Sequence, residues 1–407
     1  MTDGSTPVVI AAVGDLIVDR PDPDDFFAAA AATLRAADIT IGQLEVPHAT
    51  TRAVATVDVP APPADPAHLG AVARAGFDVL TLAGNHIGDA GGDGIAETIV
   101  AAHEYGMATT GAGVDLEAAW TPAIISSGDV RVGILSVNCV GPTDSWATSR
   151  RPGGAYVHVL SHYEAVGANP GGPPSVHTFA DPRSLANMRQ RIADAAARVD
   201  VLVVALHKGL VHTPAELAAY ETEVSHAAVD AGADLVIGHH AHIMRGVEIY
   251  RGHAIFHGLG NFVTVTDALT PSAASVDEQR RWAQRRRKLF GFEPDPALPS
   301  WYPFHPESRN SAIALLKRSP TGQLWWGLVP CWIDENARPV PHGRDERGEA
   351  VLDYIRRITA EEGFDIDFAW EGDVVRIRPT PEETHTGETH TGETHAGETH
   401  TEEIDHD

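Results

Sequence analysis

Histidine, carboxylate and amide side chains recur beside glycines along the first two thirds of this 407-residue chain. The densest run is Gly238-His239-His240-Ala241-His242, and two histidines separated by one residue in a loop can turn both imidazoles toward one cation. His239 is an alternative metal ligand in this run, if its residues face the cation in a different register. The candidate ligands of a metal site are Asp15, Glu45, Asn85, His207, His240 and His242.

This mixture of oxygen and nitrogen donors suits Mn, Fe or Zn, and it differs from a thiolate-rich structural zinc site. Six ligands can hold one or two divalent metal ions. Two ions about 3.5–4 Å apart would clamp the attacking water and the leaving oxygen of a displacement. A water shared by them would lose a proton near neutral pH. The residues therefore predict a metal-dependent hydrolase.

His86 directly follows the candidate ligand Asn85 and could act as a general acid for the leaving group. Asp89, three residues further on, could orient that imidazole and favour its protonated form. The alternative is that Asp89 only caps the helix expected from Gly94.

Three other residues are candidates for substrate binding. Lys208 adjoins a candidate ligand, and Ser308 and Arg309 could contact a carboxylate or phosphate. The basic segments 280–281 and 285–288 could also hold an anion, although a solvated helix face is the commoner outcome of such a pattern.

The elements that must position these residues alternate between strand and helix. Short β-branched runs predict strands at Val8–Val13, Asp38–Leu44, Asp78–Leu82, Val130–Asn138, Val201–Leu206, Asp234–Ile237 and Ala254–Phe256. Helices are expected at Asp25–Ala37, Pro66–Ala75, Gly94–Tyr105, Pro182–Arg198, Pro214–Ala231 and Glu349–Glu362. This alternation predicts an α/β layered fold, in which loops at the carboxyl ends of the strands gather the polar residues.

A single domain is expected over residues 1–380, with a core at about 8–265. Glycine and proline clusters mark an irregular insertion at about 141–180, and a C-terminal elaboration at about 266–380 contains a hairpin of Ala312–Lys317 and Leu324–Ile333. Residues 381–407 repeat Thr-His-Thr-Gly-Glu with a period of five and have almost no apolar surface, which predicts a disordered tail that could at most bind metal weakly.

The formal charge is −26, and about −17 remains when the tail, with its nine carboxylates, is set aside. This balance argues against binding to nucleic acid or to an anionic membrane, because both need a basic face. The two cysteines, Cys139 and Cys331, are expected to be buried and reduced. With neither a basic leader nor a segment long enough to span a membrane, the sequence predicts a cytoplasmic protein. Its oligomeric state is left open.

Six segments taken in order resemble the CapA-type (PGA_cap, poly-γ-glutamate capsule) branch of the calcineurin-like metallophosphoesterase superfamily, over about residues 8–265. They are Gly14-Asp15, Gly42-Gln43-Leu44-Glu45, Gly84-Asn85-His86-Ile87-Gly88-Asp89, His207-Lys208-Gly209, Gly238-His239-His240-Ala241-His242 and Gly258-Leu259-Gly260-Asn261-Phe262. The resemblance implies a four-layer α/β/β/α sandwich and a two-metal site. It also implies that the six candidate ligands bind metal and that His86 donates a proton.

Two departures from the superfamily pattern affect this expectation. Ile17 stands where a histidine ligand is usual, and Glu45 stands where an aspartate is usual. The first change removes a ligand from one metal, so a mononuclear site or a weakly held second ion becomes an alternative.

Three functions follow from these residues and the resemblance. The first is hydrolysis of a phosphoester by a metal-bound hydroxide, on a small-molecule or oligomeric anionic substrate. The second is metal-dependent amide hydrolysis or transfer on a glutamyl-type compound. The third, a non-enzymatic accessory role in capsule polymer synthesis, would be expected to come with a membrane signal or anchor.

Overall fold

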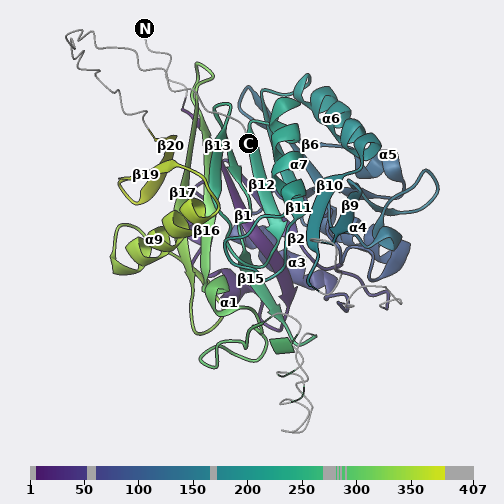
Figure 1. Ribbon diagram of the computed structural model, residues 1–407, viewed down its shortest axis with the longest axis horizontal. Coiled ribbons are helices and arrows are strands. Elements are labelled where there is room, and N and C mark those ends of the chain that lie inside the picture. Colours follow the sequence, from purple (N-terminus) through teal and green to yellow (C-terminus); the bar gives the residue numbers. More distant parts are fainter. Residues whose placement is uncertain are drawn as a thin grey trace, which may run out of the picture.

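Two β-sheets stacked face to face form the centre of the molecule, as the computed structural model shows for residues 6–52, 61–165, 172–268, 281, 284, 287–288 and 291–380 (Figure 1). The first sheet contains β1 (Val8–Asp19), β2 (Ile39–Leu44), β3 (Val79–Thr81), β4 (Ala108–Thr110), β15 (Asn261–Thr266), β16 (Asn310–Arg318), β17 (Leu324–Ile333), β18 (Pro339–Pro341), β19 (Ile366–Glu371) and β20 (Val374–Pro379). The second contains β6 (Ala123–Ser127), β7 (Val130–Asn138), β11 (Val201–Lys208), β12 (Leu235–His240), β13 (Val247–Tyr250) and β14 (His253–Phe256).

Both sheets have a parallel centre. The main path of the first sheet is β19-β20-β17-β16-β1-β2-β3-β4, in which β1 to β4 are parallel; β15 also pairs with β1 in parallel, and β18 pairs with β17. The order in the second is β13-β14-β12-β11-β7-β6, with β14, β12, β11 and β7 parallel. The carboxyl ends of the parallel strands therefore lie at one edge of each sheet.

Side chains along each strand alternate between the two faces of the sheet, so one set packs between the sheets and the other packs under the outer helices. On β1, Ile10 and Ala12 face the second sheet and pack with side chains such as Ile134 and Val203, whereas Ala11 and Val13 face the outer helices. Both sets are almost fully buried. The two sheets thus share one apolar interior.

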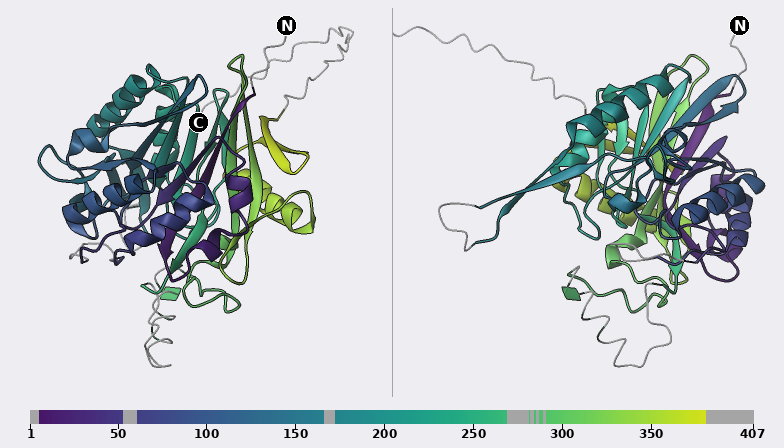
Figure 2. Two further views of the ribbon diagram at one scale, coloured as in Figure 1. Left: turned by 180° about the vertical axis from the view of Figure 1, so that it is seen from behind. Right: turned by 90° about the vertical axis from the view of Figure 1, so that its right-hand side faces the viewer.

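Helices cover the two outer faces. The outer face of the first sheet carries α1 (Asp24–Phe27), α2 (Ala31–Leu34), α3 (Leu69–Ala75) and α4 (Gly91–Glu104), and that of the second carries α5 (Leu116–Ala119), α6 (Pro182–Ala196) and α7 (Ala219–Asp230). A further helix, α9 (Glu346–Glu361), packs against β17 and β16 and touches β13 (Figures 1 and 2). The α/β class and the four-layer sandwich are confirmed.

The remaining elements are short. They comprise 3-10 turns η1 (Pro66–His68), η2 (Thr143–Ser145) and η3 (Pro306–Arg309), the bridge of β5 (Ala112–Gly113) with β8 (Gly153–Gly154), and a hairpin of β9 (Val159–Glu164) with β10 (Ser175–Ala180). The hairpin belongs to the expected insertion at 141–180 and projects from the body in the right-hand view of Figure 2.

Several predicted boundaries need correction. The first strand, predicted over Val8–Val13 with a loop at Gly14-Asp15, does not end there. β1 continues to Asp19 through an irregularity at Asp15–Leu16 and gains β15 as a partner. The single helix expected over Asp25–Ala37 is instead the pair α1 and α2. The helix expected from Pro214 begins at Ala219.

The remaining expectations concern the C-terminal hairpin, the basic helix, the tail and membrane-spanning segments. The predicted hairpin near Thr321-Gly322 is present as β16 and β17. Most of the helix predicted near Ser275–Lys288, which carries the basic segments 280–281 and 285–288, lies outside the described residues, as does the whole tail 381–407. None of the helices in the described part of the chain is long and apolar enough to cross a membrane.

Candidate metal centre

The six candidate ligands converge where the carboxyl edges of the two sheets meet. Asp15 lies within β1, and Glu45 and Asn85 follow β2 and β3, so all three come from the first sheet. His207 lies in β11, His240 ends β12 and His242 follows it, so the imidazoles come from the second sheet. The site therefore exists only because the two sheets are stacked.

One group of donor atoms surrounds His207. Its Nε2 lies 2.8 Å from Asn85 Oδ1 and 3.6 Å from Glu45 Oε1. Donor atoms of Glu45, His207 and His240 all lie within 4.8 Å of one another. Ligand atoms about 2.1 Å from a shared ion are about 3.0–3.4 Å apart in octahedral or tetrahedral geometry. The spacing fits a cation shared by these residues.

A second group surrounds His242. Its Nδ1 lies 3.4 Å from Asp15 Oδ2, and its Nε2 lies 3.9 Å from Glu45 Oε1. Glu45 is thus the carboxylate common to both groups. Ile17 is buried and brings no donor atom to the Asp15 side. The group around His207 is consequently the richer in ligands.

The charge state of the cluster also fits a cation. Asp15 Oδ1 and His207 Nδ1 are buried and have no hydrogen-bond partner within the described part of the chain. Burial raises the pKa of Asp15 to about 8, and the backbone N–H of His240 and the Glu45 side chain only partly oppose this effect. Burial, together with the neighbouring histidines, holds the pKa of His207 well below its usual range. A divalent ion would compensate the buried carboxylates and use neutral imidazoles as ligands.

The backbone at the site is held in unusual conformations. Gly14 lies so close to Gly260 that a Cβ on Gly14 would be 2.0 Å from the Gly260 carbonyl oxygen, and Asp15 N donates to that oxygen at 2.9 Å. His240 and His242 have φ angles of 84° and 53°, a region that residues other than glycine rarely adopt. Such strain persists where the surrounding structure fixes it and is typical of functional sites.

His86 and Asp89 form a hydrogen-bonded pair beside the cluster. His86 Nδ1 lies 2.8 Å from Asp89 Oδ2, which also accepts the Ala61 N–H at 2.7 Å. Asp89 is buried, whereas the His86 side chain is 15% exposed. The N-cap of α4 is Ala90, so Asp89 orients the imidazole and does not cap this helix.

His239 and Lys208 point away from the donor atoms, because neighbouring residues of a strand face opposite sides. His239 Nε2 donates to the Val13 carbonyl at 3.1 Å, and burial lowers its pKa to about 4. Lys208 Nζ lies 3.4 Å from Glu221 Oε2 and donates to the His257 carbonyl at 3.2 Å. Lys208 is fully buried behind the site.

Ser308 and Arg309 are also bonded elsewhere. Arg309 donates to the Ile333 carbonyl and to Asp295 and lies over the Trp332 ring. Ser308 is fully buried against Tyr302. Substrate binding by Lys208, Ser308 or Arg309 stays a prediction that these contacts do not favour.

Sequence reasoning gave no role to Asn261 and did not single out Tyr302, although both act on His242. Asn261 Oδ1 accepts from His242 Nδ1 at 2.9 Å, and Asn261 Nδ2 donates to the Tyr302 hydroxyl at 3.2 Å. Tyr302 in turn donates to the Ser308 carbonyl at 3.1 Å. This chain fixes the His242 tautomer with Nδ1 protonated, which leaves Nε2 as the nitrogen for metal ligation.

The protein is of the layered α/β class: it is an α/β/β/α sandwich with a buried cluster of histidines and carboxylates at its edge. The family model described as bacterial capsule synthesis protein PGA_cap matches residues 9–266, and the chain belongs to this family.

Curated relatives come from several bacteria. The chain is 32% identical over 200 residues to a probable polyglutamine synthesis accessory protein of Mycobacterium tuberculosis, covering 46% of this chain and 44% of the relative. It is 30% identical over 194 residues to the capsule biosynthesis protein CapA of Bacillus anthracis, covering 47% and 41%. The chain thus spans less than half the length of these relatives.

Solved structures give a weaker likeness. A calcineurin-like phosphoesterase of Bacillus subtilis matches with a TM-score of 0.36 and 13% identity, covering 88% of this chain and 97% of that one. A putative 5′-nucleotidase of Staphylococcus aureus matches with a TM-score of 0.42 and 12% identity, covering 86% and 58%. At these TM-scores, the likeness has no bearing on the activity of the chain.

Proposed function

We propose that this protein is a metal-dependent hydrolase that acts on a phosphoester. The observation that carries the proposal is the convergence of Asp15 and Glu45 with His207, His240 and His242 at one buried point between the two sheets. Asn85 completes the donor set through its contact with His207. One or two divalent ions, Mn, Fe or Zn, match these donors.

A divalent ion bound by these residues would supply polarisation of the phosphoryl oxygens and activation of water. The protein's own groups have distinct tasks in this proposal. His86 donates a proton to the leaving oxygen, since its ring is partly exposed and Asp89 holds Nδ1, which directs Nε2 toward the substrate. Asn261 and Tyr302 position His242 and do not touch the substrate.

Hydrolysis of an amide on a glutamyl-type compound is the second candidate. It is favoured by the names of the relatives, which refer to polyglutamine synthesis and to capsule biosynthesis. An accessory role without turnover is the third candidate, because the Mycobacterium tuberculosis relative is called an accessory protein. A location in the cytoplasm belongs to the proposal and agrees with two buried free thiols, Cys139 and Cys331.

Turnover assays with added Mn distinguish these candidates. The substrates are p-nitrophenyl phosphate, bis(p-nitrophenyl) phosphate and γ-glutamyl-p-nitroanilide, and the variants are His240→Ala and, as control, the exposed His103→Ala. We expect hydrolysis of a phosphoester that His240→Ala reduces by at least about 100-fold and that His103→Ala leaves intact.

Each other outcome has a defined meaning. Turnover of the anilide alone would support the amide hydrolase. Metal binding without any turnover would support the accessory role. Full phosphoester activity in His240→Ala would refute the proposed site.

A further inference from the structure

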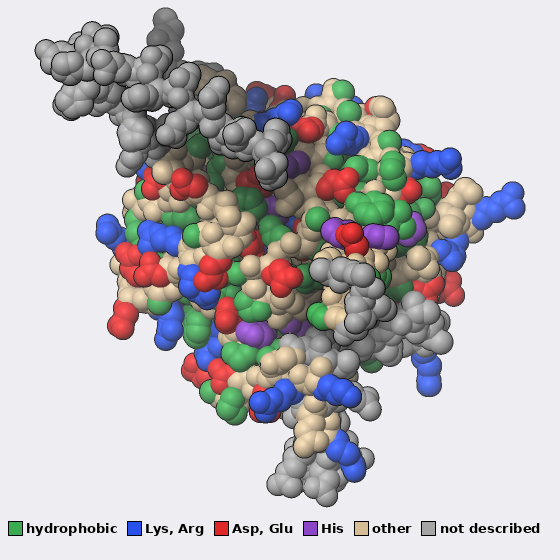
Figure 3. Space-filling view, viewed as in Figure 1, with side chains coloured by type: hydrophobic (Ala, Val, Ile, Leu, Met, Phe, Trp, Pro, Cys, Tyr) green, Lys and Arg blue, Asp and Glu red, His purple; other side chains and the backbone are tan. Residues whose placement is uncertain are grey.

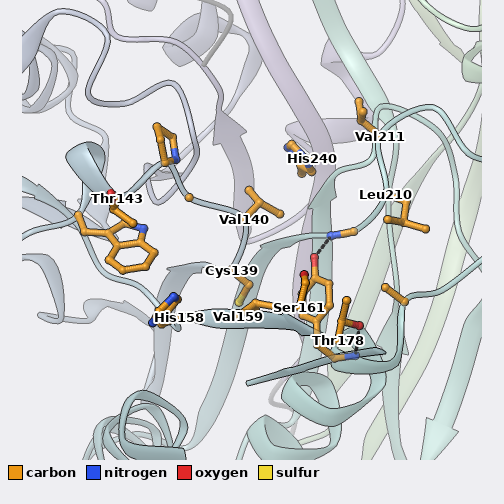
Figure 4. A pocket seen from close by; sticks show the side chains of 16 residues that line it. Cys139, Val140, Thr143, His158, Val159, Ser161, Thr178, Leu210, Val211 and His240 are labelled. Carbon is orange, nitrogen blue, oxygen red and sulfur yellow. Dashed lines mark hydrogen bonds between the residues drawn. The ribbon is translucent and has the colours of Figure 1, made fainter. Parts of the chain in front are cut away.

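A cavity of about 530 Å³ adjoins the candidate metal centre at His240. In Figure 4, His240 lies between Val140 and Val211 on one side of it, while Thr143 and His158 lie on another. Its volume falls within the range of about 300–1,000 Å³ that is usual for small-molecule sites. A substrate whose reacting group is at the metal centre would place its remaining part here.

The lining of this cavity carries no Asp, Glu, Lys or Arg among the residues that the structure describes. Its surface is formed by apolar side chains, backbone, three hydroxyl residues, Tyr220, and the imidazoles of His158 and His240. Lys208 and Arg245 lie behind its floor and are fully buried, whereas the exposed Arg151 is not among the lining residues and donates to the carbonyls of Thr143 and Trp146 at 3.1 and 2.8 Å. Lys208 contacts Glu221, and Arg245 donates to the Leu210 carbonyl at 2.5 Å. Each of these three basic side chains is thus hydrogen-bonded to a carbonyl of the protein.

One wall of the cavity is held in place before any ligand binds. Asn138 Nδ2 donates to the Gly141 carbonyl at 2.9 Å, and the Val140 N–H donates to Asn138 Oδ1 at 2.9 Å. The Trp146 ring stacks on Tyr156 with centroids 4.2 Å apart and an interplanar angle of 5°. A preformed wall lowers the entropy lost on binding a rigid apolar group.

The opposite wall belongs to the β9–β10 hairpin and continues beyond the cavity. Ser161 and Thr178 are cross-strand partners, and both line the cavity. The next pair on the same face, two residues further out, is Tyr163 with Val176. Their side chains are 66% and 55% exposed, which is unusual for an apolar pair. Phe179, on the opposite face of the hairpin, is 43% exposed.

We infer that the substrate is a phosphoester whose part beyond the phosphoryl group is uncharged and apolar, with room for more than one ring. Its first ring lies between the Cys139–Trp146 loop and the inner face of β9–β10, and the group beyond it contacts Tyr163 and Val176. This inference rests on the proposed function. It disfavours a polyanionic chain, because no described lining residue would pair with repeated carboxylates.

Calorimetry with non-hydrolysable probes tests the inference without turnover. The Mn-loaded full chain is titrated with methylphosphonate, phenylphosphonate, biphenyl-4-ylphosphonate and 3-phosphonopropionate. We expect phenylphosphonate to bind at least about tenfold more tightly than methylphosphonate, because a ring leaves water. The carboxylate of 3-phosphonopropionate should bring no gain over methylphosphonate.

Two variants of the hairpin form a matched pair. Tyr163→Ala should weaken biphenyl-4-ylphosphonate by about three- to tenfold, whereas Phe179→Ala, on the opposite face, should not change it. Neither variant should change methylphosphonate binding, which reports the metal centre alone. Both side chains are exposed, so their loss should leave the fold intact.

The outcomes separate this inference from the proposed function. Equal affinity for the methyl and phenyl probes, or tighter binding of 3-phosphonopropionate than of phenylphosphonate, would overturn the inference alone. An equal effect of Tyr163→Ala and Phe179→Ala would overturn the role of the hairpin face. Failure of all four probes to bind Mn-loaded protein would overturn both the inference and the phosphoester proposal.

Discussion

Tyr302→Phe tests whether the chain from Ser308 through Tyr302 and Asn261 controls His242. The Tyr302 hydroxyl is fully buried, accepts from Asn261 Nδ2 at 3.2 Å and donates to the Ser308 carbonyl at 3.1 Å. Removing it leaves two buried polar groups without this partner, each worth about 1–3 kcal/mol. We therefore expect the free energy of unfolding to fall by roughly 2–6 kcal/mol.

The variant should also weaken metal binding. Without Tyr302, the Asn261 amide can rotate, and His242 Nδ1 loses a fixed acceptor at 2.9 Å. Loss of a group that orients a metal-ligating histidine costs about 10–100-fold in affinity. The effect should fall on the ion nearest Asp15 and His242, while the group around His207 keeps its ligands.

Calorimetric titration with Mn measures both the affinity and the number of ions. The control is Tyr220→Phe, since that hydroxyl is also buried and accepts the Gly209 N–H at 2.7 Å but does not contact His242. Both proteins keep the His-rich tail, so any metal that it binds cancels in the comparison. Unchanged Mn affinity in a folded Tyr302→Phe protein would refute the reasoning.

Three further predictions concern the proton donor, one buried carboxyl and the close approach of two strands. His86→Gln should lower kcat by about 10²–10⁴ without loss of bound metal, and Asp89→Asn should have a smaller effect of the same kind; loss of metal from either variant would show a ligand role instead. Burial raises the pKa of Glu362 from 4.5 to about 7. Between these two pH values the folded protein keeps a proton that the unfolded chain releases. The free energy of unfolding should therefore fall by up to about 1.4 kcal/mol for each unit by which the pH rises. Urea unfolding at pH 5 and pH 7 should show that Glu362→Gln reduces this slope; an identical slope would contradict it. Gly14→Ala should destabilise the protein by at least about 1–3 kcal/mol, because its Cβ would lie 2.0 Å from the Gly260 carbonyl oxygen, and a wild-type unfolding midpoint would show that the strands can separate at no cost.

Sequence reasoning located the ligand-bearing segments because each adjoins a short apolar strand. Val130–Asn138 is identical in prediction and structure, and the strand before Glu45 differs by a single residue. The predicted end of the first strand was wrong at Asp15, where a glycine followed by a carboxylate indicated a loop. The strand continues there because Gly14 allows the Gly260 backbone to approach, a contact between residues far apart in the chain.

The direction in which neighbouring side chains face could partly be predicted from the sequence. If His207 faces the site from a strand, Lys208 must face away, and the same rule separates His239 from His240. The hydrogen-bond chain of Asn261, Tyr302 and Ser308 could not be predicted from the sequence. Tyr302 and Ser308 lie in a segment without regular periodicity, so only the folded structure reveals that they meet Asn261.

An anomalous difference map from crystals grown with Mn would show directly whether the cluster of Glu45, His207 and His240 binds a metal ion. We predict a peak within about 2.0–2.3 Å of His207 Nε2 and Glu45 Oε1, with a second, weaker peak toward Asp15 and His242. Crystals that show Mn elsewhere, for instance only at other histidines, with no peak between Glu45, His207 and His240, would contradict it.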